Sequence, residues 1–330
     1  MKAILNRLFA YQTLSRPEAQ DVLLRMGKGE FNPSQMAAFL TVFNLRNITL
    51  DEMEGFRDAM LELCLRVDLS DFSPTDLCGT GGDGKDTFNV STLAAFVVAG
   101  AGEKVAKHGN YGVSSNCGSS NVIEYLGYRF TADPETLKRQ LDKVGICFLH
   151  APLFHPAMKY VAPVRRELGI KTFFNMLGPM VNPTDPPRQL IGVFSLELAR
   201  IYGYLYQQTD KDFLIVHSLD GYDEISLTGP FKAIDRQGER FVYPKDWNFQ
   251  QIQPGQLAGG TTIPEAAQIF VRILKNEGSR AQNNAVIANA AAAIYALAPQ
   301  KGITDALSRA RTSLLGGHAL KAFERLIQMQ

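Results

Sequence analysis

The sequence predicts an α/β protein, in which an N-terminal helical domain precedes a larger α/β domain with a mainly parallel central sheet, leaving a cleft between them. Three observations support this. Helix-start signals are concentrated before residue 70, short β-like runs alternate with helical segments after Pro74, and a glycine-rich loop leads into an apolar helical run. We expect domains at 1–69 and 70–330, with the helices near 155–185 free to pack back onto the first.

The first domain contains three helix starts. Ser15-x-x-Glu18 and Thr49-x-x-Glu52 are capping boxes, and Asn32-Pro33 places proline directly after a cap. The linker 67–74 holds two aspartates, two serines and a proline, and it predicts the domain boundary. One helical face before it is apolar, formed by Met53, Phe56, Met60 and Leu63.

The second domain alternates strand and helix signals. Alternation of this kind predicts a mainly parallel sheet flanked by helices, and the strand ends beside the cleft are the expected ligand site. Helical signals return from Pro264 onward. The β-like runs are 104–106, 146–149, 190–193 and 213–217, and helices are expected at 93–101, 122–126 and 155–168.

Cys78–Gly84 is the most informative segment, because it has four glycines within six positions. Glycines are costly to order, and they let backbone N–H groups approach a ligand closely. The helix expected next is capped near Asn89 or Ser91, so the loop leads into a helix N-terminus, where phosphate is favoured. Neither the G-x-G-x-x-G nor the P-loop pattern fits. Taken alone, such a loop is more often a plain turn.

A second loop rich in donors follows the run 104–106. It holds Lys107-His108-Gly109-Asn110 and then several serines before a helical run. A cation, an imidazole, an amide and hydroxyls suit phosphate and ribose oxygens. Lys107 alone could be a solvated charge and His108 a partly buried histidine, but two such loops in one strand–loop–helix repeat favour a shared ligand site.

Composition argues against several other classes. The 330 residues are 45% apolar, enough for a substantial core, and the net charge of +1 argues against general binding to nucleic acid or a membrane surface. The N-terminus lacks a signal-peptide core and the run 290–298 is too short to span a bilayer, so we expect a cytoplasmic protein. Reduced thiols without C-x-x-C spacing are expected at Cys64, Cys78, Cys117 and Cys147.

Several long motifs then point to one family. They are D-L-C-G-T-G-G-D-G, T-F-N-V-S-T, K-H-G-N and S-S-N-C-G-S-S-N-V-I-E within 76–127, the run 155–183, and G-Y-D-E-I-S at 221–226. Their order resembles that of the anthranilate phosphoribosyltransferases, in the nucleoside phosphorylase and phosphoribosyltransferase group of glycosyltransferases (family 3). The resemblance covers most of the chain. The sequence departs from it in two places, each of which removes a charged side chain from the loop: Tyr111 stands where Arg is common, and Ser120-Asn121 replaces Ala-Asp.

The resemblance implies transfer of the phosphoribosyl group of phosphoribosyl pyrophosphate (PRPP) to the amine of anthranilate, in tryptophan biosynthesis, by a homodimer joined through the helical domain. Because the amine attacks C1 of the ribose as pyrophosphate leaves, positioning and charge neutralisation suffice, and no catalytic base is needed. The implied PRPP-binding residues are Gly79, Gly82, Asp83, Thr87, Asn89, Val90, Ser91, Thr92, Lys107, His108, Gly109, Asn110, Tyr111, Gly112, Val113, Ser114, Ser115 and Ser119.

Mg²⁺ is the implied cofactor, with two ions per subunit, because pyrophosphate leaving demands positive charge. Asp223-Glu224 follows a strand and a glycine turn, and these carboxylates suit a metal bound partly through waters. An ordinary solvated acidic loop is the alternative interpretation, which the family match disfavours. By resemblance, Ser91 binds a second ion.

Anthranilate, a carboxylate on an aromatic ring, needs a cation and a flat apolar wall. Arg165 lies in the helical run 155–168, and a guanidinium matches a carboxylate with two hydrogen bonds, whereas Arg166 is expected to be solvated. His155-Pro156 is either a helix start or part of the site. The resemblance adds Gly79 and Asn110 as anthranilate contacts, and His108, Met176 and Gly178 could line the ring.

Two alternatives remain open at the level of sequence. A pyrimidine nucleoside phosphorylase shares the architecture and a lysine-containing phosphate site, but it does not need Asp223-Glu224 for a pyrophosphate metal. A catalytically silent paralogue that binds nucleic acid or regulates is disfavoured by the near-neutral charge and the intact acidic pair.

Overall fold

The computed structural model describes residues 1–112 and 117–330, which form two compact units. Unit 1 comprises Met1–Val67 and Ala151–Pro183, and unit 2 comprises Asp68–His150 and Thr184–Gln330. Residues 151–183, which the predicted division left with the second domain or packed back onto the first, thus belong to unit 1. Within the described ranges, no helix is both long and apolar enough to cross a membrane, and all four cysteines are free thiols.

Unit 1 is helical. The expected helical run 155–168 is wrong in its first half, where a 3-10 turn, Pro156–Tyr160, precedes a helix that begins at Ala162. Pro163 explains the break, because its ring and missing N–H prevent this helix from continuing one upstream. The helices are α1 (Lys2–Phe9), α2 (Arg16–Gly27), α3 (Pro33–Leu45), α4 (Leu50–Glu62), α8 (Ala151–Phe154), α9 (Ala162–Leu168) and α10 (Phe174–Leu177), with a second 3-10 turn at Gly178–Met180.

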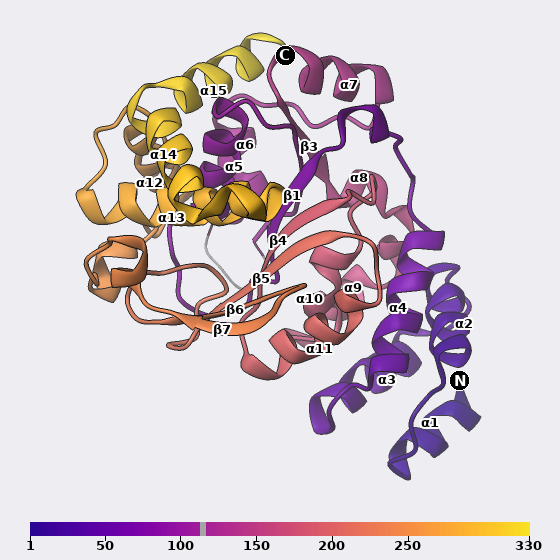
Figure 1. Ribbon diagram of the computed structural model, residues 1–330. Helices are drawn as coiled ribbons and strands as arrows, with labels where there is room; N and C mark the ends of the chain where they lie inside the picture. The colour runs from indigo at the N-terminus through magenta and orange to yellow at the C-terminus, as the bar shows by residue number, and fades with distance from the viewer. Residues whose placement is uncertain (113–116) are drawn as a thin grey trace. The chain divides into compact units, whose positions relative to one another are not determined.

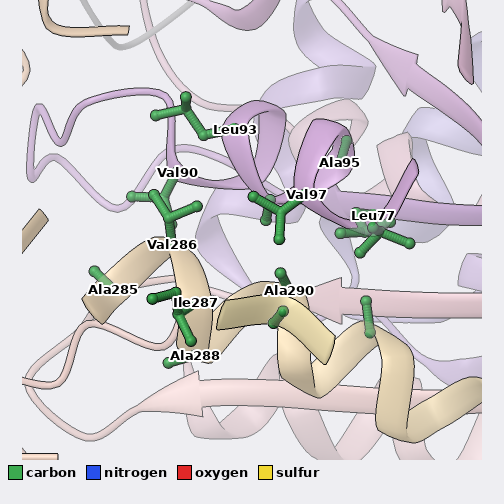
Figure 2. Close-up of a cluster of buried hydrophobic side chains, with 14 of the residues drawn as sticks. Leu77, Val90, Leu93, Ala95, Val97, Ala285, Val286, Ile287, Ala288 and Ala290 are labelled. Carbon is green, nitrogen blue, oxygen red and sulfur yellow. The ribbon is translucent and has the colours of Figure 1, made fainter. Parts of the chain in front are cut away.

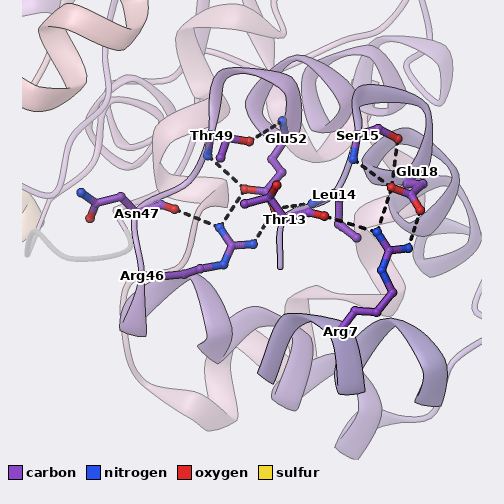
Figure 3. Close-up of polar contacts among 9 residues, drawn as sticks. All are labelled: Arg7, Thr13, Leu14, Ser15, Glu18, Arg46, Asn47, Thr49 and Glu52. Carbon is purple, nitrogen blue, oxygen red and sulfur yellow. Dashed lines mark hydrogen bonds and ion pairs between the residues drawn. The ribbon is translucent and has the colours of Figure 1, made fainter. Parts of the chain in front are cut away.

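The predicted helix starts of α2, α3 and α4 are confirmed as capping boxes. Glu52 does more than cap α4, because its fully buried carboxylate also accepts from the backbone N–H of Leu14 at 3.0 Å and pairs with Arg46 (Figure 3). Burial raises the pKa of Glu52, but the hydrogen bonds from Arg46, Thr49 and Leu14 outweigh it, so the pKa is lowered. One carboxylate therefore ties three N-terminal segments together.

An aromatic cluster joins the two sequence segments of unit 1. Phe173 stacks on Phe56 of α4 with ring centroids 4.2 Å apart, and it meets Phe39 and Phe43 of α3 edge-on. Phe173 is fully buried, as are Phe39 and Phe56. Burial of several large rings in one place is the main reason that residues 151–183 pack on the N-terminal helices.

Unit 2 is built on a seven-stranded sheet with the order β3-β2-β1-β4-β5-β6-β7. The first five strands are parallel, and β6 and β7 add an antiparallel hairpin at one edge. Each of the four β-like runs named from the sequence falls on a parallel strand. The strands are β1 (Thr75–Gly79), β2 (Val105–Gly109), β3 (Ile146–His150), β4 (Arg188–Gly192), β5 (Asp212–Ser218), β6 (Phe231–Asp235) and β7 (Gly238–Val242).

The strand order reverses direction between β1 and β4. The chain runs outward from β1 through α5 to β2, and outward on the other side from β4 through α11 to β5. Because parallel crossovers are right-handed, opposite directions put α5 and α11 on opposite faces, as Figure 1 shows. A ligand crevice is expected outside the carboxyl ends of the strands at this point. The helices are α5 (Val90–Gly100), α6 (Ser119–Tyr125), α7 (Pro134–Lys143), α11 (Leu196–Gln207), α12 (Ile263–Leu274), α13 (Arg280–Leu297), α14 (Gly302–Leu315) and α15 (His318–Gln328).

The core of unit 2 lies between the sheet and the pair α5 and α13. Figure 2 shows side chains of the two helices meeting, with Val97 of α5 above Ala290 of α13. Both helices are apolar nearly all round, which is typical of helices buried on several sides. The alanine-rich run 290–298, which is too short to span a bilayer, is therefore mostly part of a core helix, α13. Its small side chains let α13 approach α5 closely.

Candidate active site

Five parallel strands end at one edge of the sheet in unit 2. Gly79, Gly109 and Gly192 end β1, β2 and β4, and Gly79 is directly paired with Gly192 across the point where the strand order reverses. The predicted glycine loop follows β1, the predicted donor-rich loop follows β2, and the acidic pair follows β5. The topology therefore brings together three segments that are up to 145 residues apart in the chain (79 to 224).

The glycine loop has a conformation that needs its glycines. Gly81, Gly82 and Gly84 have φ of 64°, 76° and 70°, in the left-handed region that other residues rarely adopt. The end of the loop is held in place, because Phe88 donates its backbone N–H to the carbonyl of Leu257 at 3.0 Å. The loop is thus a fixed turn that opens onto α5.

Gly79 and Gly192 have a different purpose from the one predicted for the loop glycines. A Cβ on Gly79 would lie 2.4 Å from Oδ2 of Asp223, and one on Gly192 would lie 1.6 Å from the carbonyl oxygen of Asp223. These strand-end glycines therefore make room for residues 223–225, which we call the acidic segment. The glycine pattern in the sequence predicted only that a ligand approaches Gly79 closely.

The two carboxylates of the acidic pair are turned toward the glycine loop and the start of α5. Oδ2 of Asp223 accepts from the backbone N–H of Gly81 at 2.7 Å, and Oε1 of Glu224 accepts from that of Ser91 at 3.0 Å. Thr87 Oγ1 lies 3.4 Å from the second oxygen of Glu224. The positive end of the α5 dipole, where a phosphate was expected, is here in contact with Glu224.

Asp223 is buried, Glu224 is half-buried, and both lie close to a third carboxylate, that of Asp83. Burial and the charge of Asp83 raise the pKa of Asp223, and burial with the charges of Asp223 and Asp83 raises the pKa of Glu224. A cation bound beside Asp223 and Glu224 would stabilise their ionised forms. A small pocket beside them is lined by Gly79, Ser91, Gly192, Asp223, Glu224 and Asn289, among others.

The donor set fits Mg²⁺ better than a softer metal. Carboxylate and hydroxyl oxygens are the ligands that Mg²⁺ prefers, and it usually keeps several waters and takes phosphate oxygens from a substrate. In the part of the chain that the structure describes, no three His, Cys, Asp or Glu residues are arranged to enclose a metal by themselves. The residues present therefore suit an ion that is completed by water and ligand oxygens.

Lys107 is not the solvated charge that was its alternative interpretation. The side chain is buried, and Nζ donates to the carbonyl of Leu77 at 2.5 Å and lies 3.4 Å from Oγ of Ser91. His108 is also buried, and its backbone N–H donates to Asp76 at 3.1 Å. A buried ammonium group next to Ser91 places positive charge beside the acidic pair.

The donor-rich loop is pinned at both ends. Oδ1 of Asn121 accepts from the backbone N–H of Gly112 at 2.9 Å and from that of Gly118 at 3.1 Å. Tyr111 donates its hydroxyl to Glu124 at 3.2 Å. The two departures from the family pattern, Tyr111 and Asn121, thus hold the loop. Of the predicted PRPP residues in this loop, Val113, Ser114 and Ser115 lie outside the described residues.

Of the other predicted PRPP residues, Asn89 and Ser119 form hydrogen bonds with the donor-rich loop, whereas Val90 and Thr92 are buried. Asn89 links the two loops, because its Nδ2 donates to the carbonyl of Cys117 at 3.1 Å. Ser119 lies beside Gly109 and donates through Oγ to the carbonyl of Asn110 at 3.3 Å. Val90 and Thr92, by contrast, are buried inside α5.

The residues predicted to grip anthranilate by its carboxylate and ring lie partly in unit 1. Arg165 on α9 is half-buried, donates to Oδ1 of Asn175 at 3.2 Å, and holds its guanidinium 5.2 Å from the ring centroid of Phe174. Burial lowers its pKa. Within residues 1–112 and 117–330 it forms no ion pair, and its buried Nε has no hydrogen-bond partner. Arg166 is exposed, and Met176 and Gly178 are half-buried.

Sequence reasoning missed two residues that shape this edge. Ser218, the last residue of β5, donates through Oγ to the carbonyl of Glu224 at 2.6 Å. Asn289 of α13 is buried and bonds to both backbone groups of Ile225. A signal for Asn289 was present, because it is an amide within a run of alanines.

Two family descriptions match the chain. The glycosyl transferase family, a/b domain, matches residues 73–320, and the glycosyl transferase family, helical bundle domain, matches residues 2–64. Among curated relatives, the anthranilate phosphoribosyltransferase of Flavobacterium johnsoniae is 57% identical over 100% of this chain and 99% of its own length. That of Cytophaga hutchinsonii is 52% identical over 99% and 100%.

Solved structures give the same result. The anthranilate phosphoribosyltransferase (TrpD) of Thermus thermophilus superposes with a TM-score of 0.91 at 34% identity, covering 98% of each chain. The enzyme of Saccharomyces cerevisiae in complex with PRPP and Mg superposes with a TM-score of 0.89 at 27% identity, covering 98% of this chain and 96% of that one.

Proposed function

Because the chain belongs to the anthranilate phosphoribosyltransferases of the glycosyl transferase family, we propose that it transfers the phosphoribosyl group of PRPP to the amine of anthranilate in tryptophan biosynthesis. The products are N-(5-phosphoribosyl)anthranilate and pyrophosphate. The observation that carries the assignment to this edge of the sheet is the contact of Asp223 and Glu224 with the glycine loop and α5.

Asp223 and Glu224 would hold Mg²⁺, with Ser91 as a hydroxyl ligand of a second ion. The metal would supply the positive charge that the departing pyrophosphate requires. One oxygen of each carboxylate accepts from a backbone N–H, that of Gly81 in the loop or that of Ser91 at the start of α5, and this fixes the orientation of each carboxylate. Lys107 adds a buried cation at the same place. These groups stabilise charge and position PRPP, so no side chain has to act as a nucleophile.

PRPP would be held by backbone and hydroxyl groups of the two loops, from Gly79 to Thr92 and from Lys107 to Ser119. The left-handed glycines keep the first loop open to a ligand, and Asn121 closes the ends of the second. Donors that are already fixed before binding lose little conformational entropy when a polar ligand binds.

Arg165 would bind the carboxylate of anthranilate. Within unit 1 the guanidinium is half-buried, rests over Phe174 and forms no ion pair with any residue the structure describes. Partial burial of a cation without an anion is unfavourable, and a ligand carboxylate would offset that cost. Gly79 and Asn110 stay as predicted contacts of the same substrate.

The direct test is the fluorescence of anthranilate. It should decrease with time only when the enzyme, PRPP and Mg²⁺ are all present, and chelation of Mg²⁺ by EDTA should stop it. The matched control replaces PRPP and anthranilate by a pyrimidine nucleoside and phosphate. Release of free base in that control, with stable anthranilate fluorescence in the first assay, would favour the nucleoside phosphorylase alternative.

We also propose a homodimer in the cytoplasm. Exposed apolar side chains support the dimer. Phe9, Tyr11 and Leu45 are 58%, 78% and 81% exposed, and they lie near the ends of α1 and α3, two helices that contact each other. Sedimentation velocity of the purified protein and fractionation of cells that express it test the two statements.

A further inference from the structure

Asn289 is a polar residue in an apolar place. It lies in α13 between Ala288 and Ala290, which belong to the packed cluster in Figure 2, and its side chain is 3% exposed. A buried amide destabilises a protein unless its donors and acceptor are satisfied.

The side-chain amide of Asn289 forms hydrogen bonds with both the backbone N–H and the backbone carbonyl of Ile225, a residue of the acidic segment. Oδ1 accepts from the backbone N–H of Ile225 at 3.0 Å, and Nδ2 donates to the carbonyl of Ile225 at 2.9 Å. Nδ2 also donates to the carbonyl of Ala285, one turn earlier in α13, at 2.9 Å. Asn289 thus pairs with Ile225 as a neighbouring β-strand would, and the bond to Ala285 fixes the orientation of the amide.

Ile225 directly follows the two carboxylates. Ser218 holds the preceding peptide, since its Oγ donates to the carbonyl of Glu224 at 2.6 Å and accepts from the backbone N–H of Ser226 at 3.2 Å. On the opposite side, the backbone N–H groups of Gly81 in the glycine loop and of Ser91 in α5 bind carboxylate oxygens of Asp223 and Glu224. The backbone of the acidic segment is therefore fixed by Ser218 and Asn289, and its side chains are left to face the pocket.

We propose that Asn289 is a positioning residue for the metal-binding carboxylates, acting through the backbone of Ile225. This inference rests on the proposed metal role of Asp223 and Glu224. Asparagine suits the task because it offers a donor and an acceptor at the reach required. Aspartate would lack the donor, and leucine, with a similar volume, would leave both groups of Ile225 buried and unpaired.

Direct metal binding tests the proposal. The free Mn²⁺ fraction is followed by electron paramagnetic resonance while Mn²⁺ alone is titrated into the full chain, as wild type, Asn289→Ala, Asn289→Leu and Asp223→Asn/Glu224→Gln. Mutation of a residue that supports a metal ligand typically weakens metal affinity by roughly tenfold to a hundredfold. We expect that weakening in both Asn289 variants, and loss of the site in the double variant.

Ser313→Ala is the matched control. Ser313 is a buried residue of α14 whose Oγ donates to the carbonyl of Val97 at 2.6 Å, so the variant also loses a buried bond to backbone, but not one to the acidic segment. It should lower the melting temperature and leave Mn²⁺ affinity unchanged. Asn289→Leu keeps the volume of the core, so a folded variant is available if Asn289→Ala does not fold.

The outcomes separate the two ideas. Wild-type Mn²⁺ affinity in a folded Asn289 variant, together with loss in the double variant, would refute the positioning role and leave the metal site standing. Mn²⁺ binding in the double variant equal to that of wild type would refute the metal role, and the inference with it. Equal weakening in Ser313→Ala and the Asn289 variants would show a general effect of stability and would also refute the proposal.

Discussion

Arg165 is a half-buried cation in unit 1. Among the residues that the structure describes, it has no acidic partner. If its guanidinium binds the substrate carboxylate, Arg165→Ala removes a charge-assisted pair worth on the order of 2–3 kcal/mol, and kcat/KM for anthranilate should fall roughly thirtyfold to a hundredfold or more. The KM for PRPP should change far less. Steady-state kinetics with each substrate varied in turn measure both effects.

Two variants serve as controls for Arg165. Arg165→Lys should recover little, because a point charge cannot reproduce the planar fork. The exposed neighbour, Arg166→Ala, should be mild. Equal and small effects at both arginines would mean that the substrate carboxylate is bound elsewhere.

His155 is a buried residue with a pH-dependent effect on stability. Its Nε2 lies 3.0 Å from the carbonyl of Val181, and burial lowers its pKa from 6.5 to about 4. Between these values the unfolded chain binds a proton that the folded chain does not. The free energy of unfolding should therefore fall by about 3 kcal/mol as pH falls through that window. Urea unfolding at pH 7 and pH 4 measures it, and a folded His155→Gln variant should lack this part of the pH dependence.

The strand ends of β1 and β4 show what an element contributes to the site. A methyl group on Gly192 would overlap the carbonyl oxygen of Asp223, so Gly192→Ala must displace the acidic segment or the strand. Overpacking of this kind costs about 1–3 kcal/mol or more. We expect a lower melting temperature together with weaker Mn²⁺ binding. The control is Gly229→Ala. Gly229 lies in the connection between β5 and β6 that also contains Asp223, but the added methyl would have open space around it, so neither the melting temperature nor Mn²⁺ binding should change.

At this scale the sequence predicted much of the fold. Helix caps, the alternation of strands and helices, and the glycine loop are local patterns, and the structure contains all of them. It could not predict that Gly79 and Gly192 seat Asp223, because that contact joins positions 144 and 31 residues apart (79 to 223 and 192 to 223). Asn289 was missed for the same reason, and the break before α9 was missed although Pro163 signalled it.

At the scale of the whole molecule, the two units contribute different chemistry. Unit 2 gathers carboxylates, glycine amides, hydroxyls and Lys107 at the ends of parallel strands, which suits phosphate oxygens and a divalent cation. Unit 1 contributes a half-buried guanidinium in a helical unit rich in phenylalanine. The motifs at 76–127 and 221–226 lie in unit 2, and the motif at 155–183 lies in unit 1. The chemistry of one unit alone fits more than one reaction, so the motifs of both units were needed to predict the activity.

Assembly is the last property of the whole molecule, and the helical unit offers a surface for it. Phe9, Tyr11 and Leu45 are large apolar side chains at or just beyond the ends of α1 and α3, and each is more than half exposed. If they form a dimer contact, Phe9→Ser with Leu45→Ser should shift the protein to a monomer in sedimentation velocity, because a few central apolar side chains carry most of the free energy of such contacts. Tyr204→Ser, an equally exposed aromatic of α11 in unit 2 at 59%, is the control and should leave the sedimentation coefficient unchanged. A double variant that sediments as wild type does would exclude this surface from the dimer.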